Sequence, residues 1–190
     1  MSKSNKNALG LLVILAVVAG ALFYLFQPQF GQPTIELTND FESNGFRFSY
    51  PEGWQHQIPQ TNMLFLGSPE VLAQQVGASI TVQRSIRLSG ETDTLEAALA
   101  FYLERGPLRA DRAWTVIGDV ENITFAERDA LLVSLEGAEI AGTTPMHSDI
   151  YITRANNGLI YVFTVTAPQE QWQAIQPTLT AILNSVTILE

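Results

Sequence analysis

The chain of 190 residues contains no cysteine, and after residue 6 it contains no lysine. The absence of cysteine excludes disulfides, thiolate metal ligands, a cysteine nucleophile and a lipid-modified cysteine. The absence of lysine excludes lysine-based catalysis from the rest of the chain. Glycine-rich phosphate loops and the Gly-x-Ser-x-Gly and Ser-x-x-Lys motifs are also missing. No motif therefore names a catalytic residue, a cofactor or a set of metal ligands.

Basic charge is scarce and unevenly placed. The two lysines, Lys3 and Lys6, precede a long apolar run, and all 19 acidic residues lie at Glu36 or later. Eight arginines against these 19 acids leave the part of the chain after the run at a net charge of −11. Such a surface repels phosphate backbones, so nucleic acid is excluded as an expected partner.

One apolar run, residues 8–26, contains 19 residues without a charge. At about 1.5 Å per residue a helix of this length spans about 28 Å, close to the thickness of a bilayer core. Twelve of its residues are Leu, Ile, Val or Phe. We therefore predict a transmembrane anchor here, and not a buried core helix, because the run is apolar on every face.

A cleaved signal peptide is the main alternative to an anchor. Ala19, Gly20 and Ala21 form a cluster of small residues that a signal peptidase could accept. The apolar helix continues past this cluster through residues 22–27, which favours an uncleaved anchor.

The lysines predict the orientation of the anchor. The positive-inside bias keeps residues 1–7 in the cytoplasm, so the acidic domain lies outside it at the cell membrane. Residues 27–40 contain Pro28, Gly31 and Pro33 and form a linker. Residues 41–190 then form one extracytoplasmic domain.

Alternating apolar residues predict two strands in the first half of the domain. Residues 45–50 place Phe46, Phe48 and Tyr50 on one face, and a turn at residues 51–53 leads into Trp54. We expect these aromatic residues in the core. In the second strand only one residue, Arg84, interrupts the apolar row Ile80, Val82, Ile86 and Leu88.

Two segments have helical spacing instead. Residues 94–105 carry one apolar stripe, with Asp93 as the expected N-cap. A second stripe runs from Trp172 to Leu183, and Pro177 inside it predicts two short helices or one kinked helix.

The remaining segments read as strands joined by short turns. Asn156-Asn157-Gly158 is a hairpin signal that leads into residues 159–165, which are apolar on both faces and predict a central strand. The other expected strands are 114–117, 120–125, 128–136, 146–154 and 185–189. Strands joined by hairpins and covered by a few helices predict an α+β domain, an antiparallel β-sheet with helices on both faces.

The pattern resembles the PsbP-like fold. The resemblance rests on the opening Gly45-Phe46-Arg47-Phe48-Ser49-Tyr50-Pro51-Glu52-Gly53-Trp54, the 94–105 helix, the 150–165 hairpin and the closing Ile182-Leu183-Asn184-Ser185-Val186. This group includes the photosystem II subunit PsbP, a nuclear Ran-binding protein and many bacterial membrane-anchored domains. The resemblance implies an α/β/α sandwich over residues 41–190 that binds or assists other proteins, with no shared catalytic residues and no photosynthetic role.

His147 and Asp149 are the strongest candidates for a site. They alternate on one predicted strand and therefore point to the same face, followed by Tyr151 and Thr153. A solvated strand face is the simpler interpretation, and a metal or catalytic site would need a further ligand such as Glu139.

Other polar residues have simpler explanations. His56 is expected at the surface or in a turn, and the acidic pairs Glu91/Asp93 and Glu127/Asp129 at turns. Arg84 is expected to reach the sheet margin, pair with an acid or face a pocket.

Two functions remain. The first is a membrane-anchored, non-catalytic extracytoplasmic binding or accessory domain that contacts a protein or an envelope component. The alternative is a metal- or carboxylate-assisted extracytoplasmic hydrolase that uses His147 and Asp149.

Overall fold

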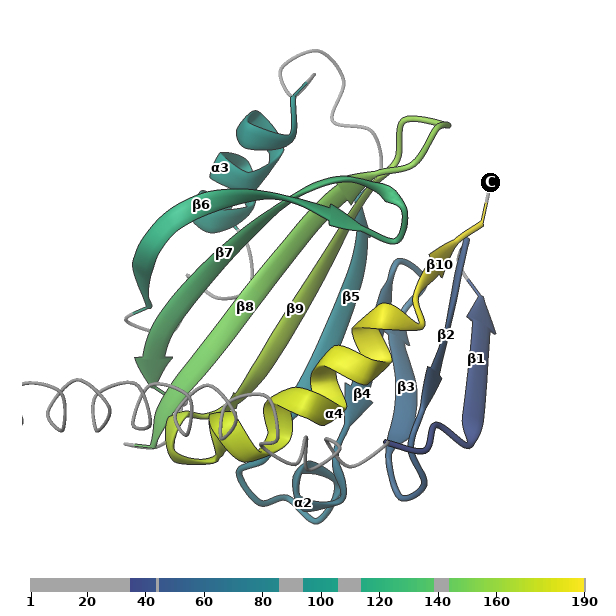
Figure 1. Ribbon diagram of the computed structural model, residues 1–190, viewed down its shortest axis with the longest axis vertical. Coiled ribbons are helices and arrows are strands. Elements are labelled where there is room, and N and C mark those ends of the chain that lie inside the picture. The colour runs from purple at the N-terminus through teal and green to yellow at the C-terminus, as the bar shows by residue number, and fades with distance from the viewer. Residues whose placement is uncertain (1–34, 44, 86–93, 106–113, 139–143, 190) are drawn as a thin grey trace, which may run out of the picture. The chain divides into compact units, whose positions relative to one another are not determined.

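The computed structural model describes residues 35–43, 45–85, 94–105, 114–138 and 144–189 (Figure 1). The predicted anchor at residues 8–26, the strand residues Ile86 and Leu88, and the acids Glu91, Asp93 and Glu139 lie outside these ranges. No helix within the described ranges is long and apolar enough to cross a membrane.

The larger sheet of the described residues is antiparallel and has seven strands, in the order β3-β4-β5-β9-β8-β7-β6 (Figure 1). The strands are β3 (Gln55–Gln60), β4 (Met63–Gly67), β5 (Ser79–Ser85), β6 (Thr115–Phe125), β7 (Arg128–Ala138), β8 (Pro145–Arg154) and β9 (Ile160–Pro168). β9 is central and every one of its residues is buried. This confirms the central strand that its continuous apolar run predicts.

A second, three-stranded sheet was not expected. It consists of β1 (Asn39–Ser43), β2 (Phe46–Tyr50) and β10 (Thr187–Ile188) in the order β1-β2-β10. The first and last predicted strands therefore pair with each other and not with the main sheet. The prediction of a single sheet is wrong. The alternation of apolar residues indicates which face of a strand is buried, but not which strand it pairs with.

In the part of the chain that the structure describes, four helical segments accompany the sheets: α2 (Pro69–Leu72), α3 (Leu95–Arg105), the 3₁₀ turn η1 (Gln169–Gln171) and α4 (Trp172–Asn184). The N-terminus of α3 is capped by Thr94, whose Oγ1 accepts a hydrogen bond from the Ala97 N–H at 3.1 Å. α4 is one helix that contains Pro177, so it is not divided into two.

The two faces of the seven-stranded sheet carry separate cores. On one face, Ala98 and Leu99 of α3 pack on buried residues of β7, β8 and β9. On the other face, Leu179 and Ile182 of α4 and the aromatic residues of β2 form the larger core. The helices therefore cover both faces, as predicted, and Phe46, Phe48 and Trp54 are buried in the larger core.

β6 is one long strand where two were expected. Its pairing with β7 shifts between Ile117 and Glu121, and Gly118 within this irregularity has a φ of +74°. Glycine adopts this conformation without steric strain, so the strand bends here and resumes. Most of β6 is exposed, since it is the outer strand of the sheet.

Candidate functional site

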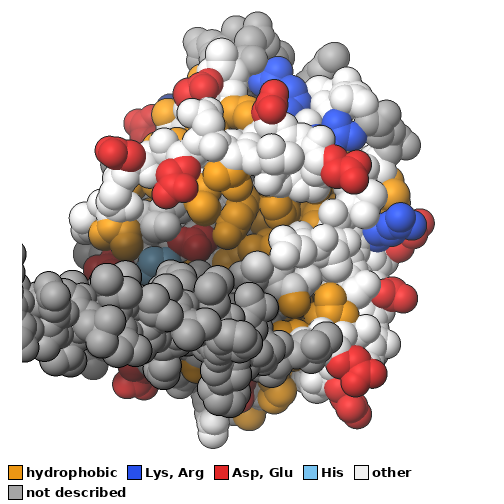
Figure 2. All heavy atoms as spheres, in the orientation of Figure 1, with side chains coloured by type: hydrophobic (Ala, Val, Ile, Leu, Met, Phe, Trp, Pro, Cys, Tyr) orange, Lys and Arg blue, Asp and Glu red, His pale blue; other side chains and the backbone are white. Residues whose placement is uncertain are grey.

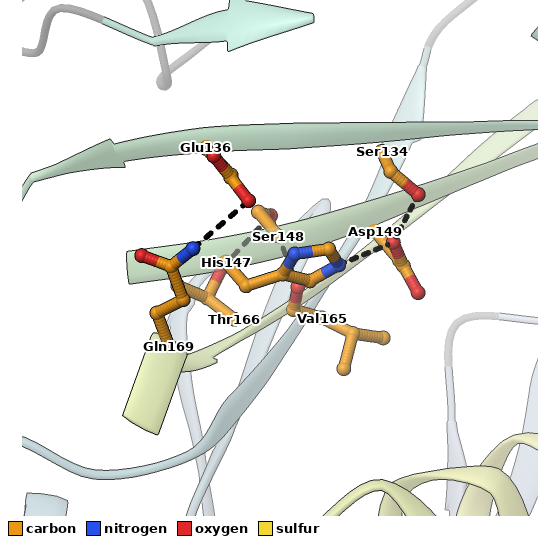
Figure 3. A network of polar contacts seen from close by, with 8 residues as sticks. All are labelled: Ser134, Glu136, His147, Ser148, Asp149, Val165, Thr166 and Gln169. Carbon is orange, nitrogen blue, oxygen red and sulfur yellow. Dashed lines mark hydrogen bonds and ion pairs between the residues drawn. The ribbon is translucent and has the colours of Figure 1, made fainter. Parts of the chain in front are cut away.

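His147 and Asp149 contact each other on the α4 side of the main sheet (Figure 3). His147 Nε2 lies 3.0 Å from Asp149 Oδ1, and both side chains are about one-seventh exposed, at 13% and 14%. Ser134 of β7 donates a hydrogen bond of 2.6 Å to the same oxygen of Asp149. Ser134 and Asp149 are directly opposite each other in the β7–β8 pairing, which places both side chains on one face.

The network continues to the start of α4. The His147 ring lies against the Trp172 indole, with ring centroids 3.9 Å apart. Glu136, opposite His147 on β7, accepts a hydrogen bond of 3.0 Å from Gln169 Nε2 in η1. These contacts attach η1 and α4 to β7 and β8.

The arrangement orients an imidazole but does not form a nucleophile–base pair. A serine nucleophile must hydrogen-bond to the histidine that removes its proton. Here Ser134 and His147 both contact Asp149, so the carboxylate lies between the serine and the base. Among the described residues, no three His, Asp or Glu side chains are grouped as a metal would require.

A broader surface lies beside the network, where β6, β7 and β8 extend past α4. α4 packs mainly on β9 and β2. We call the α4-side surface of these three strands the open face, and it consists of Glu121, Ile123, Leu132, Ser134, Asp149 and Tyr151. Figure 2 shows hydrophobic side chains gathered in a hollow on this side of the domain, with acidic side chains around it.

Tyr151 is at the centre of the open face. Leu132 is opposite it on β7, and its ring lies 5.3 Å from that of Phe125. Burial, together with the negative charges of Asp149 and Glu121, raises the pKa of Tyr151 from its ordinary value of 10.0 to about 12. The two carboxylates therefore act on one aromatic side chain, Asp149 from the same strand and Glu121 from β6, on the far side of β7.

The other candidate residues lie elsewhere. His56 is on exposed strand β3, as expected for a surface residue, and its Nδ1 is 3.1 Å from the Tyr50 hydroxyl. Arg84 hydrogen-bonds to Tyr161, and this interaction lowers the pKa of that phenol while burial raises it more. Glu127 and Asp129 are exposed at the β6–β7 turn, in agreement with the prediction.

Sequence reasoning missed Ser134, Glu136 and Trp172 as partners of the two predicted residues. Strand period places Ser134 and Glu136 on one face of β7, but only the strand register brings them opposite Asp149 and His147. Trp172 was predicted as part of the apolar stripe of a helix, and its contact with His147 depends on how that helix crosses the sheet.

Comparison with known proteins gives the fold alone. No family model matches the sequence, and no curated protein matches it. A crystal structure from Bacteroides thetaiotaomicron aligns with a TM-score of 0.54 and 12% identity over 82% of this chain, which spans half the length of that protein.

Three further solved structures match over nearly their full lengths. Cyanobacterial PsbP from Synechocystis is 16% identical, with a TM-score of 0.53, and the alignment covers 83% of this chain and 96% of that one. The Ran-binding protein Mog1p from Saccharomyces cerevisiae is 9% identical, with a TM-score of 0.56, and the alignment covers 82% of this chain and 97% of Mog1p. LpqN of Mycobacterium tuberculosis, involved in cell envelope biogenesis, is 12% identical, with a TM-score of 0.51. The alignment covers 85% of this chain and 88% of LpqN. The chain therefore has the PsbP-like fold, as its sequence pattern indicated.

Proposed function

We propose that the protein is a membrane-anchored accessory domain that binds a partner protein outside the cytoplasm through the open face. The anchor is the apolar run at residues 8–26, and the orientation follows from Lys3 and Lys6. The observation that carries the proposal is the half-buried apolar surface of Leu132, Tyr151 and Ile123, which borders carboxylates and which no described helix covers.

The chemistry of the open face indicates the kind of partner. Glu121 and Asp149 contribute negative charge to it, and Glu136 lies at its border, next to His147. Between them lie the aliphatic Leu132 and the aromatic Tyr151. A complementary segment would place Lys or Arg at its edges and apolar residues at its centre.

Two of the similar proteins are consistent with contact with a protein or an envelope component. Mog1p is named as a Ran-binding protein, and LpqN as a protein involved in cell envelope biogenesis. Their identity to this chain is low, so they support contact with a protein or envelope component in general and transfer neither partner to it.

Site-specific crosslinking tests the proposal. A photoreactive amino acid at Leu132 of the full-length protein, in its native membrane, should capture a partner segment that contains Lys or Arg among apolar residues. The same group at Ile58, which is 49% exposed on β3, is the control. Glu121→Gln should reduce the Leu132 adduct. Equal capture from both positions, or capture that Glu121→Gln does not change, would contradict the open face as the binding surface.

One observation favours the alternative of an extracytoplasmic hydrolase, namely the 3.0 Å contact between His147 and Asp149. In that function the carboxylate would orient the imidazole as a general base for water. His147→Gln would then abolish hydrolysis by the purified full-length protein and leave partner capture at Leu132 unchanged. If the unmodified protein shows no hydrolysis and His147→Gln reduces partner capture at Leu132, the network serves partner binding instead.

A further inference from the structure

A cavity lies on the same domain, and none of its lining residues belongs to the histidine network. It has a volume of about 720 Å³ and lies between the β6–β7 hairpin, the β8–β9 turn, the end of α4 and β10. Figure 1 shows the β6–β7 hairpin reaching toward β10. The charged side chains of its lining are Arg47, Glu127 and Arg128, so the lining carries a net positive charge although the chain carries −9.

The arginine at the hairpin is held in place. Arg128 Nη1 donates a hydrogen bond of 2.8 Å to Asn156 Oδ1, which connects the β6–β7 hairpin to the β8–β9 turn. A guanidinium has five N–H donors in a planar fork, so a bond to Asn156 is compatible with a second acceptor in the cavity. Arg47 is exposed on β2, with Thr187 opposite it on β10 and Glu42 opposite it on β1.

The hairpin beside the cavity has an uncommon backbone. Its two turn residues, Ala126 and Glu127, have φ angles of +49° and +61°. Two-residue hairpin turns of this type favour Asn and Gly, because other side chains are strained there. Both strained residues line the cavity, and such strain is often retained where a backbone shape serves binding.

The edge of β10 supplies peptide groups at the cavity wall. β10 is the outer strand of the three-stranded sheet, and the Leu189 N–H donates to the Gly45 carbonyl at 2.7 Å. Hydrogen bonding alternates along an antiparallel pair, so the peptide groups of Ile188 point away from β2. Ile188 and Thr187 line the cavity, and an extended chain could pair with this edge.

We propose that this cavity binds an acidic peptide segment of a partner protein, with a carboxylate at Arg128 and Arg47 and the peptide backbone along β10. Arginine matches a carboxylate through paired hydrogen bonds. The C-terminal end of α4 and the Glu127 carboxylate also border the cavity, and both disfavour a doubly charged phosphate more than a singly charged carboxylate. Asn156, Asn184 and Thr124 add polar groups that suit a peptide chain.

The test uses the full-length protein in detergent at low salt and a fluorescein-labelled triglutamate peptide, with binding followed by anisotropy. The matched probe is the triglutamine peptide, which lacks only the charge. We expect saturable binding of triglutamate and at least about tenfold weaker binding of triglutamine. Equal affinities would overturn the proposal.

Variants locate the site. Arg128→Gln should weaken triglutamate binding about tenfold, and Arg47→Gln about threefold, because Glu42 already faces Arg47. Arg105→Gln makes the same charge change on exposed helix α3 and should change binding less than about twofold. An Arg105→Gln effect as large as that of Arg128→Gln would show nonspecific attraction and overturn the proposal. If Arg128→Gln does not fold, Arg47→Gln alone must weaken binding more than Arg105→Gln does.

A competition experiment distinguishes a peptide ligand from a small organic acid. Unlabelled triglutamate should displace the labelled peptide at a lower concentration than sodium glucuronate, because only the peptide pairs with β10. Displacement by glucuronate at the lower concentration would contradict the peptide as occupant. This cavity attracts negative charge and the open face attracts positive charge, so failure at one surface does not imply failure at the other.

Discussion

The His147 imidazole lies against the Trp172 indole, with ring centroids 3.9 Å apart and ring planes inclined at 44°. The contact connects the N-terminal part of β8 to the first residue of α4, and the imidazole Nε2 also lies 3.0 Å from Asp149 Oδ1. Sequence period predicted each residue separately, one on a strand and one on a helix. Their contact makes the network part of the structure that positions α4 beside the open face.

Removing the Asp149 carboxylate should destabilise the fold moderately. Asp149→Ala deletes the acceptor of the Ser134 hydrogen bond and the partner of His147, and bonds to a charged group contribute about 1.5 to 3 kcal/mol when buried. Because Asp149 is partly exposed, we expect a loss of about 1 to 2 kcal/mol in the free energy of unfolding. Urea denaturation of the full-length protein measures it.

Asp119→Ala, on the exposed outer strand β6, is the control for Asp149→Ala and should change the free energy of unfolding by less than about 0.5 kcal/mol. An Asp149→Ala protein as stable as the parent would mean that the network contributes nothing to folding.

Trp54→Ala should have a much larger effect. Trp54 is 7% exposed and packs in the larger core, and truncation of a buried tryptophan costs about 3 to 5 kcal/mol. This is a large share of a typical stability of about 5 to 15 kcal/mol. The midpoint of chemical denaturation should fall sharply. Ile58→Ala, on exposed β3, should leave it almost unchanged, and similar midpoints for both variants would contradict the packing of Trp54.

Alkaline pH should destabilise the protein through Tyr151. The folded pKa of about 12 is above the ordinary value of 10.0, so the unfolded state loses this proton first. The stabilisation is complete below pH 10 and is lost as the pH rises from 10 to 12. Two pKa units correspond to about 2.7 kcal/mol, and partial exposure of the ring reduces this to about 1 to 2 kcal/mol.

Tyr151→Phe removes the titrating hydroxyl and should make the fall in unfolding free energy between pH 10 and 12 smaller. Tyr102 and Tyr161, whose pKa values are also raised by burial, still titrate in this variant, so part of the fall remains. Urea midpoints at several pH values compare the two proteins. Identical pH profiles would mean that Tyr151 ionises as it does in water.

The proposed membrane topology gives a labelling pattern. An impermeant amine reagent on intact cells should not label the protein, because Lys3, Lys6 and the amino terminus are cytoplasmic and the rest of the chain has no lysine. Added protease should nevertheless cut the external domain. Labelling together with protease sensitivity would instead indicate a cleaved signal with a new external amino terminus. Labelling together with protease resistance would indicate the inverted orientation.

Residues 34–190 should fold as a soluble monomer without the apolar run. Residues from Ile35 to Glu190 form one compact unit, with its cores on the two faces of the seven-stranded sheet. Circular dichroism and sedimentation of this fragment are the measurements. A fragment that stays unfolded or partitions into membranes would contradict the predicted division into anchor and domain.

The pattern of apolar and turn residues along the chain was sufficient to predict many strands and helices of the fold. Alternation at Phe46, Phe48 and Tyr50, the continuous apolar run of β9 and the hairpin turn before it all predicted elements that the structure contains. β3 escaped prediction because its sequence, Gln-His-Gln-Ile-Pro-Gln, has no apolar period and all its residues are exposed. A strand at the edge of a sheet needs no buried face.

The sequence alone determined that His147 and Asp149 share a face and that the aromatic residues around Trp54 are core, since each depends only on neighbours along the chain. It also predicts that one apolar run spans a bilayer. The tertiary structure decided what those residues meet. Ser49 and Ser185, 136 positions apart, hydrogen-bond and join β2 to the end of α4. Strand register places Ser134 at Asp149, and the path of α4 leaves the open face beside it. Such pairings depend on how whole elements pack, and hydrophobic period along one strand or helix carries no information about its partner.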